Sequence, residues 1–213
     1  MDRDRERWLN ERKNGIGGSD ASVIMGLNPY KTTLQLWEEK TGRAEAEDIS
    51  EKPYVRYGTN AENLLRELFK LDFPKYEVKH EENTIIKHPK HEFLFASLDG
   101  TLKDKETGRM GVLEIKTTNI LNSTQKEKWN NRIPDNYFCQ VLHYLNVTGY
   151  TFAILKAQLK YEYDDNVRLE TRHYYIDRKD VEEDIKILEK KEIEFWNNYV
   201  VTDKRPPLLL PNI

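Results

Sequence analysis

The chain has 213 residues, a formal net charge of −3 and a single cysteine, and 38% of its residues are hydrophobic. The single cysteine excludes an internal disulfide framework and a zinc site built from cysteines, and the net charge argues against a protein that coats DNA through bulk positive charge. Apolar runs are only a few residues long, and the charged N-terminus lacks the apolar segment of a secretory signal, so we expect a cytoplasmic protein without a membrane span.

The first third of the chain has the apolar periodicity of helices. We expect helices over residues 3–13 and 33–40, and a helix that starts in the glycine-rich run 15–20 and ends near Gly26. A polar loop at 43–53 then precedes an amphipathic helix over 57–71.

Strands dominate the middle of the chain, and the C-terminal part returns to helix. Turn residues separate the predicted elements, which are strands 76–87, 93–103 and 110–117, helix 135–144, strands 151–161 and 168–176, and helix 178–199. Prolines prevent regular structure in the tail, 206–211. This order predicts one α/β domain over residues 1–213, with a central mixed β-sheet flanked by helices. We expect a mainly helical part (1–72), a sheet with its helix (73–176), and a C-terminal helix with the tail (177–213).

Two carboxylates interrupt neighbouring strands that are otherwise apolar, Asp99 in the second and Glu114 in the third. Adjacent strands can bring both within reach of one cation, and Mg²⁺ prefers such oxygen ligands. Lys116 lies two residues after Glu114 and therefore points to the same face, where its charge would activate water and stabilise a phosphate transition state. The Ile115 carbonyl is a further candidate ligand. In a plainer interpretation, Asp99 belongs to a turn, and Glu114 and Lys116 form a solvated strand face.

Three more polar residues lie on predicted helices beside these strands. Glu62 follows Gly58 by four residues, near the start of its helix. Gln140 and Tyr144 are four residues apart and share one helix face. Taken alone, Glu62 is an ordinary glutamate favoured by the helix dipole, and the other two are polar residues at a helix edge.

The glycine-rich run near the N-terminus has features of an anion site. Gly17 and Gly18 allow a backbone to approach a phosphate closely, and Ser19 lies where a helix should begin. Arg12 offers a guanidinium fork that suits phosphate. The simpler alternative is that Ser19 or Asp20 caps the helix and Arg12 is a surface residue.

The ordered set of these motifs resembles the PD-(D/E)xK nuclease superfamily. In its N-terminal motif it is similar to the phage lambda-exonuclease/YqaJ-type viral recombinase family. The resemblance covers about residues 7–145 and consists of Arg12-x6-Ser19, Gly58-x3-Glu62, Asp99, Glu114-x-Lys116 and Gln140-x3-Tyr144. The chain departs from the superfamily pattern in one place, since Leu98 precedes Asp99 where the motif has proline.

The resemblance implies a restriction-endonuclease-like core and a nuclease that depends on Mg²⁺. It implies a 5′→3′ exonuclease acting on double-stranded DNA ends, with preference for a 5′-phosphate, in phage-type recombination by single-strand annealing. Two Mg²⁺ ions, replaceable by Mn²⁺, would be held by Asp99, Glu114 and the Ile115 carbonyl, with Glu62 in contact directly or through water. A homotrimer around DNA and a single-strand-annealing partner protein are also implied.

The remaining motif residues receive roles from the same resemblance. Lys116 would orient or activate the water, Gln140 would contact the water or the scissile phosphate, and Tyr144 would support the site. Arg12 and Ser19 would bind the terminal 5′-phosphate.

Two other functions remain open from the sequence. One is an endonuclease of the same superfamily. The other is a non-catalytic DNA-end-binding protein on the same fold, against which the joint presence of Asp99, Glu114 and Lys116 argues.

The histidines do not suggest a metal site. They form no HExxH or HxH pair, so we expect them to be surface or core residues. They are His80, His88, His91, His143 and His173.

Overall fold

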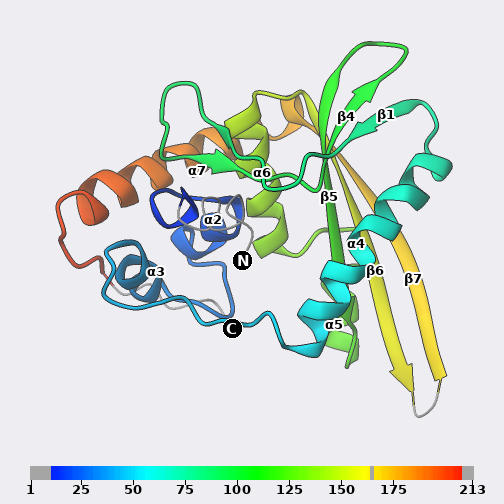
Figure 1. Ribbon diagram of the computed structural model, residues 1–213, viewed down its shortest axis with the longest axis horizontal. Helices are drawn as coiled ribbons and strands as arrows, with labels where there is room; N and C mark the ends of the chain where they lie inside the picture. Colours follow the sequence, from blue (N-terminus) through cyan, green and yellow to red (C-terminus); the bar gives the residue numbers. More distant parts are fainter. Residues whose placement is uncertain (1–10, 164–165, 208–213) are drawn as a thin grey trace.

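The structure is a computed structural model that describes residues 11–163 and 166–207. Its centre is a five-stranded sheet in the order β1-β4-β5-β6-β7 (Figure 1). Only β5 and β6 run parallel, and the other neighbours are antiparallel, so the sheet is mixed as predicted. The strands are β1 (Tyr76–Lys79), β4 (Gly100–Asp104), β5 (Met110–Asn119), β6 (Phe152–Tyr163) and β7 (Asn166–Asp177).

Helices cover both faces of the sheet and create two hydrophobic cores (Figure 1). On one face, Leu65 and Phe69 of α4 pack at helical spacing against Leu113 and Ile115 of β5. The larger core lies on the other face, between the sheet and α6, and extends to the remaining helices. The helices are α2 (Gly18–Ile24), α3 (Thr33–Lys40), α4 (Pro53–Asp72), α6 (Asp135–Thr148) and α7 (Glu182–Phe195). None of the described helices is both long and apolar enough to cross a membrane.

Two predicted strands are wrong in their extent, because each divides into two shorter strands. The predicted strand 76–87 consists of β1 and β2 (Ile86–Lys87), and the predicted strand 93–103 consists of β3 (Phe95–Ala96) and β4. β2 and β3 pair with each other in a separate sheet. The start of β3 also pairs with the N-terminal segment, since Ile16 donates its N–H to the Phe93 carbonyl and accepts from the Phe95 N–H. Asp99 therefore precedes β4 and does not lie within a strand.

Several helix boundaries also differ from the prediction. α4 begins earlier than predicted, at Pro53, because proline is favoured in the first helical turn. α6 continues to Thr148, where Gly149 with φ 68° ends it. The predicted helix 178–199 divides into a 3₁₀ turn, α7 and a π-helical segment, and a short helix, α5 (Ser123–Glu127), was not predicted.

The predictions at the two ends of the chain are tested only in part. Of the predicted helix 3–13, residues 11–13 are helical and the rest lies outside the described residues. Most of the predicted tail, 206–211, also lies outside them.

A buried ion pair joins the central helix to the C-terminal helix. His143 Nδ1 of α6 lies 2.7 Å from Glu192 Oε1 of α7, and both side chains are fully buried. His143 Nε2 lies 2.8 Å from the Phe95 carbonyl, which can only accept a hydrogen bond. Burial by itself lowers the pKa of His143, but the Glu192 carboxylate and these hydrogen bonds outweigh it, so the pKa of His143 is raised.

This pair predicts a loss of stability at alkaline pH. A histidine whose pKa is higher in the folded than in the unfolded state contributes stability in full below about pH 6.5. That contribution is lost as the pH rises through the raised folded pKa, at up to about 1.4 kcal/mol per pH unit. Urea unfolding across this pH range measures it.

The matched control is the double variant His143→Gln/Glu192→Gln, which keeps two amides of similar size in place of the ion pair. The free energy of unfolding of this variant should depend less on pH than that of the wild type. Parallel pH profiles of the two proteins would contradict a charged pair.

Candidate active site

Asp99 is fixed at the point where β4 stops short of β5. The β4–β5 pairing ends at Gly100 opposite Leu113, although β5 continues to Asn119. Beyond that point Asp99 Oδ2 accepts a hydrogen bond from the Ile115 N–H at 2.7 Å. The carboxylate thus takes the place of the backbone carbonyl that a longer β4 would offer to this N–H. Because the N–H and C=O of one strand residue point to the same side, the Ile115 carbonyl faces this side as well.

Glu114 and Lys116 lie on the face of β5 opposite to Leu113 and Ile115, as their spacing predicts. Lys116 Nζ lies 2.6 Å from Glu114 Oε1, and the Glu114 side chain is only 1% exposed. Its second oxygen, Oε2, is buried and has no hydrogen-bond partner among the described residues. A buried acceptor without a partner is rare in proteins and requires an explanation, such as a bound ion or water.

Burial and neighbouring charges shift the pKa values of the ionisable side chains at this point. Burial, and then the charge of Asp99, raise the pKa of Glu114 to about 8 although Lys116 opposes the shift. Burial also raises the pKa of Asp99. Burial by itself lowers the pKa of Lys116. The negative charges of Glu114 and Asp99 outweigh this effect, so the pKa of Lys116 is raised. Ionising these carboxyl groups would place more negative charge here than the Lys116 ammonium offsets, and a divalent cation would relieve that cost.

Glu62 reaches the same space from α4. Gly58 permits a close approach of this helix to β5, since a Cβ there would lie 3.0 Å from Thr117 Oγ1. Glu62 is half-buried one turn later. Burial, and then the charge of Asp99, raise the pKa of Glu62.

Arg66 completes this side of the site, and the sequence analysis missed it. Its Nη2 lies 2.5 Å from Glu62 Oε1, and its Nε donates to the Asp99 carbonyl at 2.6 Å. The side chain is 7% exposed. The sequence did show that Arg66 follows Glu62 by four residues, which predicts an ion pair on one helix face. Such Glu–Arg pairs are common on solvated helices, so the spacing alone did not indicate a site.

The polar atoms that remain unengaged form a donor set for a metal ion. Protein donors occupy one oxygen of each carboxylate. Among the described residues no partner is assigned to the others, which are Glu62 Oε2, Asp99 Oδ1 and Glu114 Oε2. With the Ile115 carbonyl, these are hard oxygen donors of the kind that Mg²⁺ prefers, so the residues fit a divalent cation.

Gln140 and Tyr144 of α6 lie next to this donor set. Gln140 Nε2 donates to Tyr144 Oη at 2.8 Å. Burial, and then the charge of Glu114, raise the pKa of Tyr144. The start of α2 packs directly on both side chains, since a Cβ at Gly18 would lie 2.5 Å from the Tyr144 ring and 2.9 Å from Gln140 Cγ. Close packing against α6 therefore accounts for Gly18 without a phosphate.

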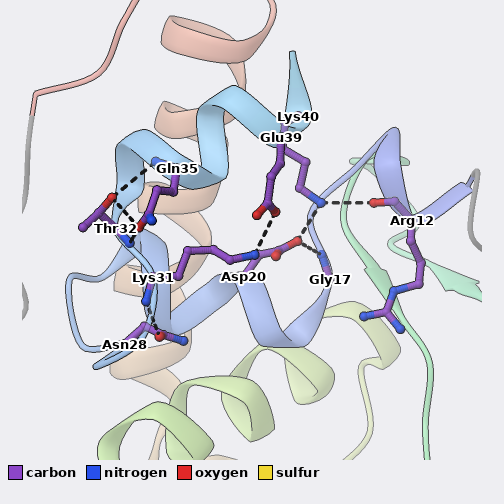
Figure 2. Close-up of polar contacts among 9 residues, drawn as sticks. All are labelled: Arg12, Gly17, Asp20, Asn28, Lys31, Thr32, Gln35, Glu39 and Lys40. Atoms are coloured by element: carbon purple, nitrogen blue, oxygen red, sulfur yellow. Dashed lines mark hydrogen bonds and ion pairs between the residues drawn. The ribbon is translucent and has the colours of Figure 1, made fainter. Parts of the chain in front are cut away.

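The N-terminal segment is held by Asp20 (Figure 2). Asp20 Oδ2 accepts from the Gly17 N–H at 3.1 Å and lies 2.8 Å from Lys40 Nζ, which also donates to the Arg12 carbonyl at 3.0 Å. Gly17 is the N-cap residue of α2, Asp20 at the third helical position binds its N–H, and Ser19 is exposed beside Asp20. The Arg12 side chain is half-buried and points away from Asp20 (Figure 2).

A second group of metal-ligating side chains lies between the β2–β3 turn and α7. His88, His91 and Glu189 place one ligand atom each within 4.8 Å of one another. His88 Nδ1 accepts the N–H groups of Lys90 and His91. In the neutral ring the proton therefore lies on Nε2. This nitrogen then has no lone pair with which to bind a metal ion beside His91 and Glu189.

The fold is that of phage-type exonucleases. An alkaline exonuclease from Laribacter hongkongensis superimposes with a TM-score of 0.59 over 93% of this chain and 97% of its own, at 16% identity. A phage-related exonuclease from Haemophilus somnus 129PT gives a TM-score of 0.57 over 89% and 96%, at 13% identity. At these identities the likeness shows the fold alone.

The sequence comparisons assign the family. Residues 7–151 match the model of the YqaJ-like viral recombinase domain, and the chain belongs to this family. It is 37% identical over 210 residues to the uncharacterized protein YqaJ of Bacillus subtilis (strain 168), covering 96% of this chain. The match spans 59% of the length of that relative. The resemblance to this family is thereby confirmed.

Gly18→Ala tests the close packing of α2 on α6. Helix propensity alone would make alanine the more stable residue by about 1 kcal/mol. The clash with the Tyr144 ring should reverse the sign and lower the free energy of unfolding by about 1–3 kcal/mol, as measured by urea denaturation. The adjacent, exposed Ser19→Ala is the control and should change little. A stabilised Gly18→Ala protein would contradict the packing.

Proposed function

We propose that this chain is a Mg²⁺-dependent exonuclease that degrades one strand of duplex DNA in the 5′→3′ direction from its ends. The observation that carries the proposal is the buried, unpartnered Glu114 Oε2 beside Asp99 and Lys116. The viral recombinase family and the exonuclease fold support it. The Laribacter enzyme has also been crystallised with dAMP, a mononucleotide of the kind that such a reaction would release.

The carboxylates would hold the metal ions, with two Mg²⁺ expected and Mn²⁺ able to replace them. Asp99, Glu114 and the Ile115 carbonyl are the proposed ligands, and Glu62 contributes Oε2 directly or through a water. When bound, these ions supply a hydroxide near neutral pH and offset charge on the leaving 3′ oxygen. Arg66 keeps Glu62 and the Asp99 backbone in position.

Lys116, Gln140 and Tyr144 would act on the water and the scissile phosphate. The pKa of Lys116 is raised, so its ammonium stays charged beside Glu114, where it can orient the attacking water and stabilise the charged transition state. The bond from Gln140 to the Tyr144 hydroxyl orients the Gln140 amide, which we assign to the water or the phosphate.

Arg12 and Ser19 would bind the 5′-phosphate of the DNA end. Gly18 packs on Gln140 and Tyr144, so the adjacent Ser19 lies close to the proposed reaction centre. Lys40 pairs with Asp20 and offsets the one carboxylate at the start of α2, which would otherwise repel an anion there. A phosphate held at this place would set the register of cleavage and favour 5′-phosphorylated ends.

The family also suggests a cellular setting for the reaction. We propose that the nuclease acts in the cytoplasm, in recombination by single-strand annealing, as a homotrimer around DNA and with an annealing protein that covers the exposed strand.

Digestion of linear duplexes tests the proposed reaction. Substrates with either 5′ end chemistry are incubated with Mg²⁺ or with EDTA, and closed-circular plasmid serves as the control. We expect mononucleotides and a surviving complementary strand from linear DNA, in Mg²⁺ only. Cleavage of the circle would favour an endonuclease, and end binding without hydrolysis would favour a non-catalytic DNA-end-binding protein.

Lys116→Ala should remove cleavage and keep DNA binding. Losing the cation beside the water and the phosphate should slow digestion by about 10²–10³-fold, with little change in affinity for duplex ends. The exposed Lys128→Ala is the control for charge alone. Wild-type digestion rates in the Lys116→Ala protein would remove the assigned role.

Arg12→Ala should reduce the preference of the nuclease for 5′-phosphorylated over 5′-hydroxyl DNA ends. The ratio of digestion rates on 5′-phosphate and 5′-hydroxyl duplexes should fall toward one, because only the phosphate loses a partner. The neighbouring Lys13→Ala, which removes an exposed cation, should leave the ratio unchanged. Equal ratios in wild type and Arg12→Ala would refute the phosphate site.

A further inference from the structure

Tyr137 lies on the face of α6 that points to the candidate active site. It precedes Gln140 by three residues and Tyr144 by seven, so the three side chains share one face of the helix. Tyr144 is buried, whereas Gln140 and Tyr137 are half-buried. Tyr137 is therefore at the outer end of the row of side chains that α6 presents to the site, and it is the one member of the row without an assigned role.

The Tyr137 ring contacts the ammonium group of Lys116. Lys116 Nζ lies over this ring, 5.3 Å from the ring centroid. The distance is within the range of a cation–π interaction, in which the negative face of an aromatic ring attracts a cation. The same Nζ pairs with Glu114 Oε1, and the Lys116 side chain is 21% exposed. Water screens the contact only in part, so the ring contributes to the position of the ammonium.

A buried tryptophan fixes the Tyr137 ring. The ring centroids of Tyr137 and Trp129 are 5.5 Å apart, and Trp129 is 3% exposed. The Trp129 carbonyl accepts hydrogen bonds from Arg172 and Tyr174 of β7, and the Tyr174 ring packs against the Trp129 ring. The ring beside Lys116 is thus tied to the edge strand of the central sheet, which gives it a defined position.

A neutral ring can hold Lys116 without competing for a metal ion. Glu114 holds the ammonium with one oxygen, and the proposed function assigns the carboxylate of Glu114 to a divalent cation as well. Binding of such a cation would weaken the attraction of Glu114 for Lys116, and the cation would repel the ammonium. A further carboxylate could hold Lys116 but would offer the metal another ligand. The Tyr137 ring attracts the ammonium and adds neither a formal charge nor a metal ligand.

We propose that Tyr137 is a positioning residue of the nuclease, whose ring holds the Lys116 ammonium by a cation–π interaction when Glu114 engages a divalent cation. This inference rests on the proposed metal-dependent function. The role belongs to the ring and not to the hydroxyl, so phenylalanine should replace the tyrosine and leucine should not. Stacking of a DNA base on this ring is the poorer assignment, because Lys116 and Trp129 already contact it.

Digestion of linear duplexes by full-length variants at residue 137 tests the positioning role. Tyr137→Phe should keep kcat within about twofold of the wild type, and Tyr137→Leu should lower it about fivefold to thirtyfold with little change in KM. Phe138→Leu is the matched control, since Phe138 is a half-buried aromatic residue of the same helix that packs against the larger core. Wild-type kcat in Tyr137→Leu, or loss of activity in Tyr137→Phe, would overturn the proposal.

Fluorinated phenylalanines at position 137 separate the cation–π interaction from packing. Each fluorine atom withdraws electron density from the ring face and changes the size of the ring little. Phenylalanines that carry one, two and three fluorine atoms should therefore lower kcat stepwise relative to Tyr137→Phe, because the attraction for the ammonium weakens with each atom. Equal kcat across the series would overturn the proposal.

A second measurement detects the contact without metal or DNA. In the metal-free wild-type protein, the ring current of Tyr137 should shift the NMR signals of the Lys116 ε-methylene protons upfield. Tyr137→Leu should remove this shift, and Phe138→Leu should keep it. Lys116 signals that are unchanged in Tyr137→Leu would overturn the proposal.

The two measurements separate this inference from the proposed function. A Lys116 signal that depends on the ring, in a protein that cleaves no DNA, would sustain the contact and refute the reaction. Metal-dependent DNA cleavage that does not depend on the ring at residue 137 would sustain the reaction and refute the positioning role.

Discussion

The candidate site depends on the burial of three carboxyl groups at one place. Glu114 is almost fully buried, Asp99 and Glu62 face the same space, and burial raises the pKa of all three carboxyl groups. Leaving carboxylates in such surroundings is costly unless cations accompany them. Lys116 and Arg66 each supply one positive charge but engage only one oxygen of Glu114 and Glu62. The remaining oxygens are therefore available to a divalent cation, which is why we propose a metal-dependent reaction at this site.

The fold brings these groups together by ending one strand early. β4 pairs with β5 only as far as Leu113, and beyond this residue no described strand pairs with that edge of β5. Asp99 enters from the end of β4, and Glu62 enters from α4, which Gly58 allows to approach closely. A complete β4 would have covered this edge with backbone hydrogen bonds, so the shortened strand is a condition of the site.

The sequence predicted the parts of the site that follow from local periodicity. The two-residue spacing of Glu114 and Lys116 was sufficient to place both on one strand face, and the amphipathic pattern located the helix that carries Glu62. It did not predict that the strand expected to contain Asp99 would divide, because local periodicity does not reveal the backbone pairing of Phe93 and Phe95 with the distant Ile16. Arg66 was missed for the same reason, since its bond to the Asp99 carbonyl joins residues that only the folded chain brings together.

The most direct test of this account is to locate the metal. Crystals of the wild-type chain soaked in Mn²⁺ would be examined for anomalous scattering at the manganese edge. We predict a peak bound by Asp99, Glu114 Oε2 and the Ile115 carbonyl. Anomalous density confined to the group of His88, His91 and Glu189, with Glu114 Oε2 still unpartnered, would contradict the account.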